Sequence, residues 1–396
     1  MPEFSESTTL LITVIFWAAV GVFAYTHIFY PALMAALSVR KQKTESPAEL
    51  PSVTLIIPAY NEEAVLEAKL QNALSIDYPG DRLEIVVASD GSVDRSVSIA
   101  RSFEPQGVRV LPFEQRRGKA SVLNDAVAAS TSDVICLCDA NVMFRPDALQ
   151  RLVARLVDPA VGAVSGDVRL ASHESDFGEG ESLYYRIDGA IQTGESSIGS
   201  MIGVDGGMYV IRKDLFRPLP HDTILDDFVT TMHVIQQGQR VVYEPSAVAD
   251  ENGTPSTAQE FRRRVRISAG AVQSLKRGQY PPISRPIELW QYVSHKLLRW
   301  IGPLPLLLML AGSLLLWNAG GIYRIAFAGQ AIVGLTAAAA WISVPFRETR
   351  AGGIPFYFVM SHVAMTVGIL RGILNRQRVT WTKTGRTSET SGAHAA

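Results

Sequence analysis

Long uncharged runs of apolar residues lie near both ends of the chain. The first lies between Glu6 and Arg40, where no Asp, Glu, Lys or Arg occurs. Three further runs are found at Trp300 to Tyr323, Ile325 to Phe346 and Ala351 to Leu370. About 20 apolar residues suffice to cross a bilayer. The pattern predicts an N-terminal transmembrane anchor at 1–39 and a C-terminal transmembrane region at 300–374, with a buried helix as the alternative for any single run.

Short runs rich in β-branched residues alternate with helical patterns between these two regions. Strands are predicted at 53–57, 83–88, 108–111 and 134–138, with helical patterns between them. This alternation favours a parallel sheet with right-handed crossovers. The predicted fold class is therefore α/β, a Rossmann-like cytosolic domain plus transmembrane helices. The expected bounds are a linker at 40–50, the α/β domain at 51–285, an interfacial amphipathic helix at 286–299 and, after the membrane region, a polar tail at 375–396.

The charged residues set the expected orientation. Glu3 and Glu6 precede the first apolar run and Arg40, Lys41 and Lys43 follow it, so the positive-inside rule places the α/β domain in the cytoplasm. If all three later runs crossed, the basic tail would end outside, against the same rule. The run at 351–370 is therefore expected to be interfacial or re-entrant. A hydrophobic fraction of 47% supports a multi-pass protein of the inner or plasma membrane, and the net charge of −1 gives no sign of nucleic-acid binding.

Polar residues cluster where the predicted strands end. Asp90 follows the second strand, Asp139 and Asn141 follow the fourth, and Lys119 stands at the start of a helix. Ligands of open α/β sheets bind at the carboxyl ends of the strands, and helix N-termini favour anions. These residues predict a site for a nucleotide diphosphate with a hard cation on Asp139 and Asn141, the alternative for Asp139 and Asn141 being an ordinary turn. No G-x-G-x-x-G and no P-loop motif is present.

Four motifs in order resemble those of the family-2 glycosyltransferases, in particular the membrane-embedded synthases of cellulose, hyaluronan, chitin oligosaccharides and poly-N-acetylglucosamine. They are Ile56-Ile-Pro-Ala-Tyr-Asn-Glu62, Ala88-Ser-Asp-Gly-Ser-Val-Asp94, Arg117-Gly-Lys119 with Asn124, and Cys138-Asp-Ala-Asn141. The resemblance implies an A-type glycosyltransferase fold, a nucleotide-sugar donor, usually a UDP-sugar, and Mg²⁺ or Mn²⁺.

The resemblance also implies roles for particular residues. Pro58, Ala59, Tyr60, Glu62 and Asp90 would border the base and ribose, and Lys119 would lie near the diphosphate. Asp139 and Asn141 stand where the family has Asp-x-Asp, so one metal ligand keeps its oxygen and loses its charge.

The second half of the α/β domain carries three further candidate segments. Asp205, Gly206 and Gly207 suit the floor of an acceptor site, a hairpin or turn being equally open. Asp226 and Asp227 precede a helix and suit helix capping. By resemblance Asp227 matches the family's catalytic Asp and would be the general base, and Asp226 would lie at the acceptor or diphosphate. Arg263, Arg264 and Arg266 occupy the place of the family's Gln-x-x-Arg-Trp, without its Gln and Trp, which argues against processive synthesis. They would instead contact the acceptor or diphosphate, or form a solvated or membrane-facing helix surface.

The expected function is inverting transfer of a sugar from a nucleotide-diphosphate donor to a growing polysaccharide or oligosaccharide at the membrane. Single-sugar transfer to a lipid-linked acceptor is the alternative, and a non-catalytic nucleotide-sugar-binding membrane protein is a further one. The expected partners are a UDP-sugar, a glycan or lipid-linked acceptor, membrane lipid and possible export or assembly subunits.

Overall fold

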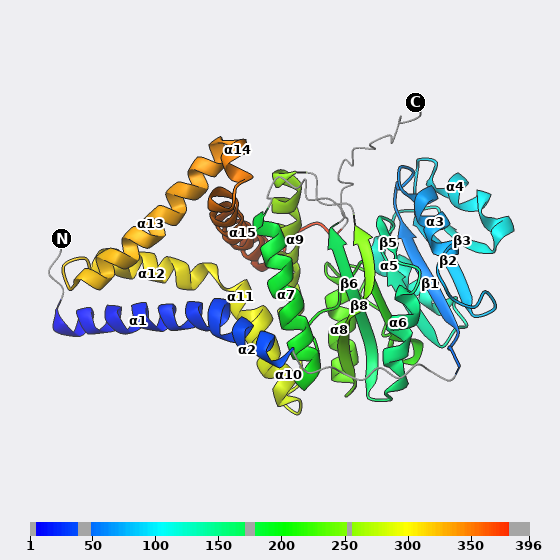
Figure 1. Cartoon of the computed structure of the whole chain (residues 1–396), viewed down its shortest axis with the longest axis horizontal. Helices are drawn as coiled ribbons and strands as arrows, with labels where there is room; N and C mark the ends of the chain where they lie inside the picture. Colours follow the sequence, from blue (N-terminus) through cyan, green and yellow to red (C-terminus); the bar gives the residue numbers. More distant parts are fainter. Residues whose placement is uncertain (1–4, 39–48, 171–178, 252–255, 380–396) are drawn as a thin grey trace.

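A sheet-containing domain is joined to an arm of apolar helices (Figure 1). The computed structural model describes residues 5–38, 49–170, 179–251 and 256–379. The predicted linker at 40–50 and polar tail at 375–396 therefore lie largely outside the described residues. Two long helices, α7 (Glu179–Ile198) and α9 (Thr257–Lys276), stand between the sheet and the arm.

The domain is built on one eight-stranded sheet with the order β3-β2-β1-β4-β7-β6-β8-β5. The first four strands in sequence are mutually parallel, whereas β7 runs antiparallel between β4 and β6. The strands are β1 (Val53–Ala59), β2 (Leu83–Asp90), β3 (Val108–Phe113), β4 (Val134–Cys138), β5 (Val142–Phe144), β6 (Val161–Leu170), β7 (Met208–Arg212) and β8 (Arg240–Glu251). The α/β class and the four strands expected from the sequence are thus confirmed.

Helices cover both faces of the sheet. Every residue of β1 is buried, as expected for a central strand packed on both sides. Leu55 and Ile57 contribute to one core, with α3 (Leu66–Leu74) and α6 (Ala148–Ala154). Ile56 contributes to the other, with α5 (Lys119–Ala128) and α8 (Asp226–Gln236). The shorter helix α4 (Ser96–Ser102) follows β2.

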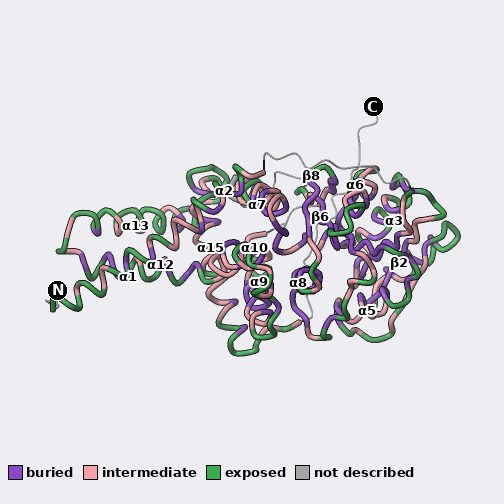
Figure 2. Tube along the Cα trace, turned by 90° about the horizontal axis from the view of Figure 1, so that it is seen from below, coloured by how far each residue is buried: buried purple, intermediate pink, exposed green. Residues whose placement is uncertain are grey.

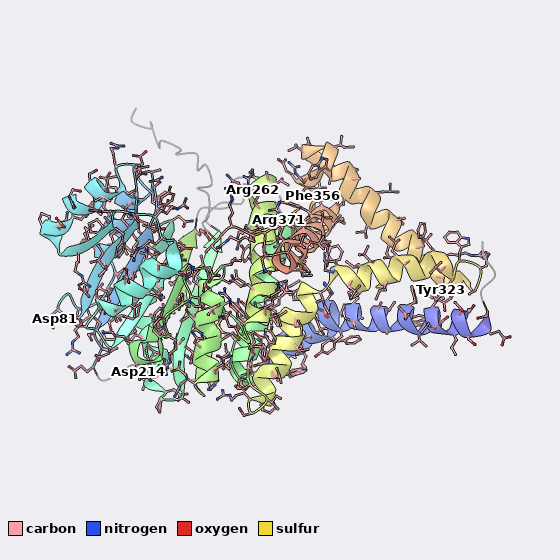
Figure 3. The ribbon with its side chains drawn as sticks, turned by 180° about the vertical axis from the view of Figure 1, so that it is seen from behind. Asp81, Asp214, Arg262, Tyr323, Phe356 and Arg371 are labelled. Atoms are coloured by element: carbon pink, nitrogen blue, oxygen red, sulfur yellow. The ribbon has the colours of Figure 1, made fainter. Side chains whose placement is uncertain are left out.

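Three apolar helices form the arm. The N-terminal segment comprises α1 (Glu6–Ala24), a π-helical turn (Tyr25–Phe29) and α2 (Tyr30–Leu37). It packs along α12 (Pro303–Leu315), and α13 (Gly321–Ile342) closes the arm at its far end, where Tyr323 lies (Figure 3). The ring centroids of Tyr323 and Phe16 are 5.1 Å apart. Figure 2 shows the outer sides of this arm largely exposed, as suits contact with lipid.

The described residues contain three helices long and apolar enough to span a membrane, or four if one bent pair counts as a span. The three are Glu6–Leu37, Gly321–Ile342 and α15 (Arg350–Ile373), which follows the short α14 (Val344–Arg347). The uncharged run expected to cross at Trp300 to Tyr323 is not one straight helix. It breaks at Gly302, and α12 is bent by 59° from the segment Pro286–Trp300, which contains α10 (Pro286–Gln291), a π-helical turn (Tyr292–Leu297) and α11 (Leu298–Trp300).

Helix α15 differs from the other candidate spans in its surroundings. In its apolar stretch 44% of the residues are buried inside the protein, against 11% for the N-terminal helix and for α13. Gly368 and Gly372 let it approach the backbone of α9 closely. Figure 1 views α15 nearly along its axis while α1 runs across the page, so the two helices lie crosswise. This arrangement favours the prediction that 351–370 is interfacial, which stays a prediction.

A buried polar network fastens the N-terminal helix to the domain. Glu195 on α7 accepts a hydrogen bond from the Tyr30 hydroxyl at 2.6 Å and lies 2.9 Å from His295 Nδ1. The other ring nitrogen of His295 lies 3.2 Å from Asp188, which also binds Arg299 at 2.8 Å. Because these groups come from three separate segments, the network holds α2, α7 and the 286–300 segment together.

We expect His295→Ala to destabilise the protein by about 3 kcal/mol, because it removes the shared partner of two buried carboxylates. His221→Ala, at an exposed position, should change the unfolding free energy by no more than about 0.5 kcal/mol. Denaturant unfolding in detergent, followed by fluorescence, measures both. Equal stability of the two variants would contradict the network's structural role.

Candidate active site

Several segments meet at the edge of the sheet where β1, β2 and β4 end. Cys138, the last residue of β4, pairs with Met208, the first residue of the antiparallel β7. The loop before β7 therefore lies at the same edge as the turn after β4. The starts of α5 and α8 reach this edge as well, since Lys119 at the start of α5 contacts Asp139 and Asp226.

Asp90 shapes the loop that leads into α5. Its carboxylate accepts hydrogen bonds from the backbone N–H of Arg117 at 2.7 Å and of Gly118 at 3.0 Å. Gly91, at φ +66°, lies so close to this loop that a Cβ would come within 2.7 Å of the Arg116 nitrogen. If Asp90 contacts a base or ribose as predicted, its carboxylate would do so while also holding this loop in place.

The residues after β1 frame the same loop. Tyr60 lies beneath the Arg116 guanidinium, whose carbon is 3.7 Å from the centroid of the Tyr60 ring. Pro58 and Ala59 are buried at the end of β1. Glu62 is buried, and its backbone N–H donates to Ser96. Among these four, Tyr60 is the residue that the structure leaves partly accessible beside Asp90.

Lys119 bridges two carboxylates that are far apart in the sequence. Its Nζ lies 2.9 Å from Asp139 Oδ1 and 3.2 Å from Asp226 Oδ2. Burial alone would lower the pKa of Lys119, but the adjacent Asp139, Asp226 and Asp227 raise it well above its ordinary value. Lys119, the cation predicted to lie near the diphosphate, therefore directly links the predicted metal ligand Asp139 to the residue next to the predicted base.

Asp139 and Asn141 fit one side of a divalent-cation site. The Asp139 side chain is 39% exposed, so its second oxygen is accessible. Asn141 donates its amide N–H to Glu251 at 2.8 Å, which leaves the amide oxygen as a further ligand. Within the described part of the chain, no group of three or more His, Cys, Asp or Glu side chains could hold a metal by itself. A cation here would need oxygens from a bound diphosphate, as Mg²⁺ sites commonly do.

Asp227 lies at the start of α8 against the loop before β7. Its carboxylate accepts a hydrogen bond from the Phe228 N–H at 2.7 Å, and a Cβ on Gly206 would lie 3.1 Å from its Oδ2. Burial and the adjacent Asp226 raise the pKa of Asp227 to about 6, while Lys119 and Arg266 act in the opposite direction. The carboxylate is therefore a stronger base than an exposed Asp.

Asp205 lies in this loop, directly before its two glycines. Its carboxylate accepts a hydrogen bond from the Gly207 N–H at 2.9 Å, and burial raises the pKa of Asp205 to about 7, with Glu251 acting in the same direction. A Cβ on Gly207 would lie 3.0 Å from Val142. The two glycines thus allow the loop to pass between Asp227 and β5.

The three predicted arginines of α9 separate into two groups. Arg264 binds Glu260 at 2.7 Å and the Tyr357 hydroxyl, and Arg263 binds Glu260 and the Tyr185 hydroxyl, each at 3.1 Å. Both therefore join α9 to its neighbouring helices. Arg266 donates to the Ile224 carbonyl at 2.9 Å, near Asp227. The structure brings Arg266 near the predicted base Asp227 and gives the other two arginines contacts that join helices.

Comparisons with known proteins agree with this geometry. A model described as glycosyl transferase family 2 matches residues 54–218. This part of the α/β domain belongs to glycosyl transferase family 2. The matched residues include Asp90, Lys119, Asp139 and the loop before β7, whereas Asp226 and Asp227 follow the matched region.

Two curated relatives and one solved structure extend the comparison. The chain is 24% identical over 255 residues to poly-β-1,6-N-acetyl-D-glucosamine synthase of Staphylococcus aureus, covering 63% of this chain and 61% of the relative. It is 30% identical over 239 residues to a probable glycosyltransferase of Bacillus subtilis, covering 57% and 56%. The matched regions thus span about three fifths of these relatives.

The solved structure is a mannosyltransferase from Pyrobaculum calidifontis in complex with GDP-Man and Mn²⁺. It is 22% identical, with a TM-score of 0.70, and the match covers 93% of this chain and 99% of that one. The fold, an A-type glycosyltransferase-like α/β domain with long apolar helices, is therefore shared over nearly the whole chain.

Two residues beside the candidate site have no signal in the sequence pattern. Glu251 ends β8 and reaches Asn141 and Asp205 only because β8 pairs with β5. Lys296 reads as a surface residue of an amphipathic helix, yet its ammonium lies beside Gly203 in the loop before β7. Both contacts depend on long-range strand and helix packing.

We expect kcat/KM to rise with pH through about 6, because only the ionised Asp227 can accept a proton. Arg266→Gln removes a cation that favours the carboxylate, so its profile should shift to higher pH. Initial rates between about pH 4.5 and 8 test this. A profile that is flat across this range, or a shift to lower pH in the variant, would contradict the assignment.

Proposed function

We propose that this protein is an inverting glycosyltransferase that moves a sugar from a nucleotide-diphosphate donor to a hydroxyl group of an acceptor held at the membrane. The observation that carries the proposal is the position of Asp227. A buried carboxylate with a raised pKa lies against a two-glycine loop, and Lys119 connects its neighbour Asp226 to Asp139. The proposed base, the loop 203–207 proposed to hold the acceptor (the acceptor loop) and the proposed donor-binding groups thus lie at one edge of the sheet.

The donor would occupy the end of β4. Asp139 and Asn141 would hold a divalent cation, which would neutralise charge on the diphosphate when bound. Lys119 is the cation of the chain itself at this position, and its ammonium can pass from Asp139 to a phosphate oxygen without leaving the site. Tyr60 and the loop fixed by Asp90 would border the base and ribose of a UDP-sugar. The mannosyltransferase of similar fold was solved with GDP-Man and Mn²⁺, which supports a nucleotide sugar with a metal.

The reaction would be one displacement. The acceptor hydroxyl oxygen forms a bond to the anomeric carbon as the bond from that carbon to the diphosphate oxygen breaks. The electron pair of the broken bond leaves with the nucleoside diphosphate, and the hydroxyl proton passes to Asp227. Attack from the face opposite the leaving group inverts the anomeric configuration.

The surroundings favour a lipid-linked acceptor that receives a single sugar. The N-terminal helix and α13 are only 11% buried along their apolar stretches, and the arm lies to one side of the domain. Arg264, expected near the acceptor or diphosphate, is bound to Glu260 and Tyr357. Growth of a polysaccharide is a second candidate, which the similarity to poly-β-1,6-N-acetyl-D-glucosamine synthase favours. In both cases the domain would face the cytoplasm, where nucleotide sugars are made.

The test is incorporation of label from a panel of UDP- and GDP-sugars by the full chain in lipid nanodiscs, with Mn²⁺ or Mg²⁺ and with extracted membrane lipid as acceptor source. We expect one donor to label a small, lipid-extractable product. A product of high mass would favour the polysaccharide candidate instead. Absence of incorporation from every donor, with donor binding intact, would contradict the enzymatic proposal.

A further inference from the structure

Lys296 reaches the acceptor loop from the membrane side of the domain. It lies on the π-helical turn Tyr292–Leu297, and a Cβ on Gly203 would lie 3.7 Å from its Nζ and 3.6 Å from its Cε. Gly203 belongs to the loop that carries Asp205, Gly206 and Gly207. The side chain therefore points toward the loop, whereas an interfacial lysine more often extends toward lipid headgroups.

The loop sets an upper limit on the separation of Lys296 from the base. Three residues lead from Gly203 to Gly206, which corresponds to at most about 10 Å of chain. Gly206 in turn lies against the Asp227 carboxylate. This length of chain, extended by the contacts at its two ends, is an upper limit, and a sugar phosphate with a hydrogen bond at each end fits within it. A group bound at Lys296 could thus belong to the same molecule as the hydroxyl that attacks.

The environment of Lys296 calls for an anion. Its side chain is half-buried, and within the part of the chain that the structure describes it has an electrostatic interaction with Asp188 but no hydrogen bond or ion pair within 4 Å. The carboxylate nearest along α7, Asp188, is already bound by His295 and Arg299. On the other side lies an aromatic cluster of Phe228, Tyr292 and Trp300, whose ring centroids are 5.5 to 6.3 Å apart. A partly desolvated ammonium beside these aromatic rings is stabilised by a bound anion.

The position in the fold indicates where that anion comes from. The segment 286–300 leads directly into the apolar helix α12, so Lys296 lies at the junction of the domain and the membrane arm (Figure 1). Sugars attached to membrane lipids through a phosphate present their anion at this depth. Arg299, one turn further along, is 23% exposed and bound to Asp188, so it offsets that carboxylate and leaves Lys296 to meet the anion.

We propose that Lys296, with Arg299 nearby, binds the phosphate group that adjoins the acceptor sugar, so that the acceptor is a phosphate-linked sugar. This inference rests on the proposed function and adds the chemical class of the acceptor to it. The phosphate can belong to a lipid-linked sugar or to a soluble sugar phosphate, and both place the same anion at Lys296. A neutral glycoside of the same sugar lacks it.

The test compares three acceptors that share one sugar: a polyprenyl-phosphate-linked sugar, a soluble sugar 1-phosphate and an uncharged alkyl glycoside. The full chain in nanodiscs is assayed as wild type, Lys296→Met and Lys296→Arg. Arg262→Met is the matched control, since it removes a positive charge from an exposed site on α9 (Figure 3).

We expect the wild type to prefer the phosphate-bearing acceptors over the glycoside. Lys296→Met should lower kcat/KM for the phosphate-bearing acceptors about tenfold more than for the glycoside, chiefly through KM. Lys296→Arg should restore most of the difference, and Arg262→Met should keep the preference. If the wild type uses the polyprenyl-phosphate-linked sugar alone, the phosphate belongs to a lipid-linked acceptor. If it also uses the sugar 1-phosphate, a soluble sugar phosphate is an acceptor as well.

Two results would overturn the inference. The first is transfer by the wild type without preference for phosphate, or an equal loss of transfer to all three acceptors in Lys296→Met. Either outcome would show that Lys296 does not recognise the acceptor, and it would leave the proposed function intact. Absence of transfer to any acceptor by the wild type would overturn the inference together with the proposed function.

Discussion

Replacing Asp227 by Asn should lower the rate of sugar transfer about 10³-fold while leaving donor affinity nearly unchanged. An amide of the same shape cannot accept the proton of the attacking hydroxyl. Its hydrogen bond with the Phe228 N–H can be kept, because the side-chain oxygen is retained. Lys119 keeps its ion pairs with Asp139 and Asp226, so the proposed donor-binding groups stay in place. Initial rates and calorimetric donor binding measure the two effects separately.

Asp222 provides the matched control for this substitution. It precedes the same helix and binds Arg277 at 2.6 Å on the protein surface. Asp222→Asn should therefore leave transfer within about twofold of wild type. If Asp227→Asn transferred sugar as fast as Asp222→Asn, Asp227 could not be the general base.

Replacing Asp139 by Ala should weaken metal-dependent donor binding by roughly 100-fold or more, since even indirect ligand partners contribute 10- to 100-fold to metal affinity. The change removes the accessible carboxylate of the Asp139-Ala-Asn141 turn and frees Lys119 to bind Asp226 alone. Donor titrations at increasing Mn²⁺ concentration, with and without chelator, measure the loss.

Asp133 is the corresponding control at the opposite end of β4. Its carboxylate accepts a hydrogen bond from Ser52, away from the candidate site. Asp133→Ala should leave the Mn²⁺ dependence of donor binding as in the wild type, with at most a modest loss of stability. If the Asp139 variant bound donor with unchanged Mn²⁺ dependence, the cation would have to lie elsewhere.

Local patterns carry most of the information about the first half of the domain. The β-branched runs of β1, β2 and β4 are short, apolar and buried, and each is followed by polar residues. Parallel strands bring such residues to one edge whatever the details of packing. The positions of Asp90, Lys119 and Asp139 at this edge were therefore predictable.

The second half depends on pairings that no local pattern reveals. Strand β6 contains Gly162 and Gly166, which resemble turn signals, but a Cβ at Gly166 would lie 2.8 Å from the Ala247 carbonyl oxygen of the adjacent β8. Close strand packing, and not a turn, explains this glycine. The proximity of Lys119 to Asp226 and of Glu251 to Asn141 likewise follows from tertiary structure alone.

Asn141 shows how the structure explains a departure from the family pattern. An Asp at this position would face Glu251, to which the Asn141 amide donates at 2.8 Å, and would place like charges together near Asp205. The amide instead keeps an oxygen toward the proposed cation and a donor toward Glu251. From the sequence alone the same residue reads only as a weakened metal ligand.

The anomeric configuration of the product after a single turnover tests the central claim most directly. Once the donor is known, NMR of the transferred sugar, taken before any further addition, reports whether the linkage is inverted relative to the donor. One displacement with Asp227 as the base predicts inversion. Retention of the donor's configuration would contradict that mechanism and the role of Asp227 within it.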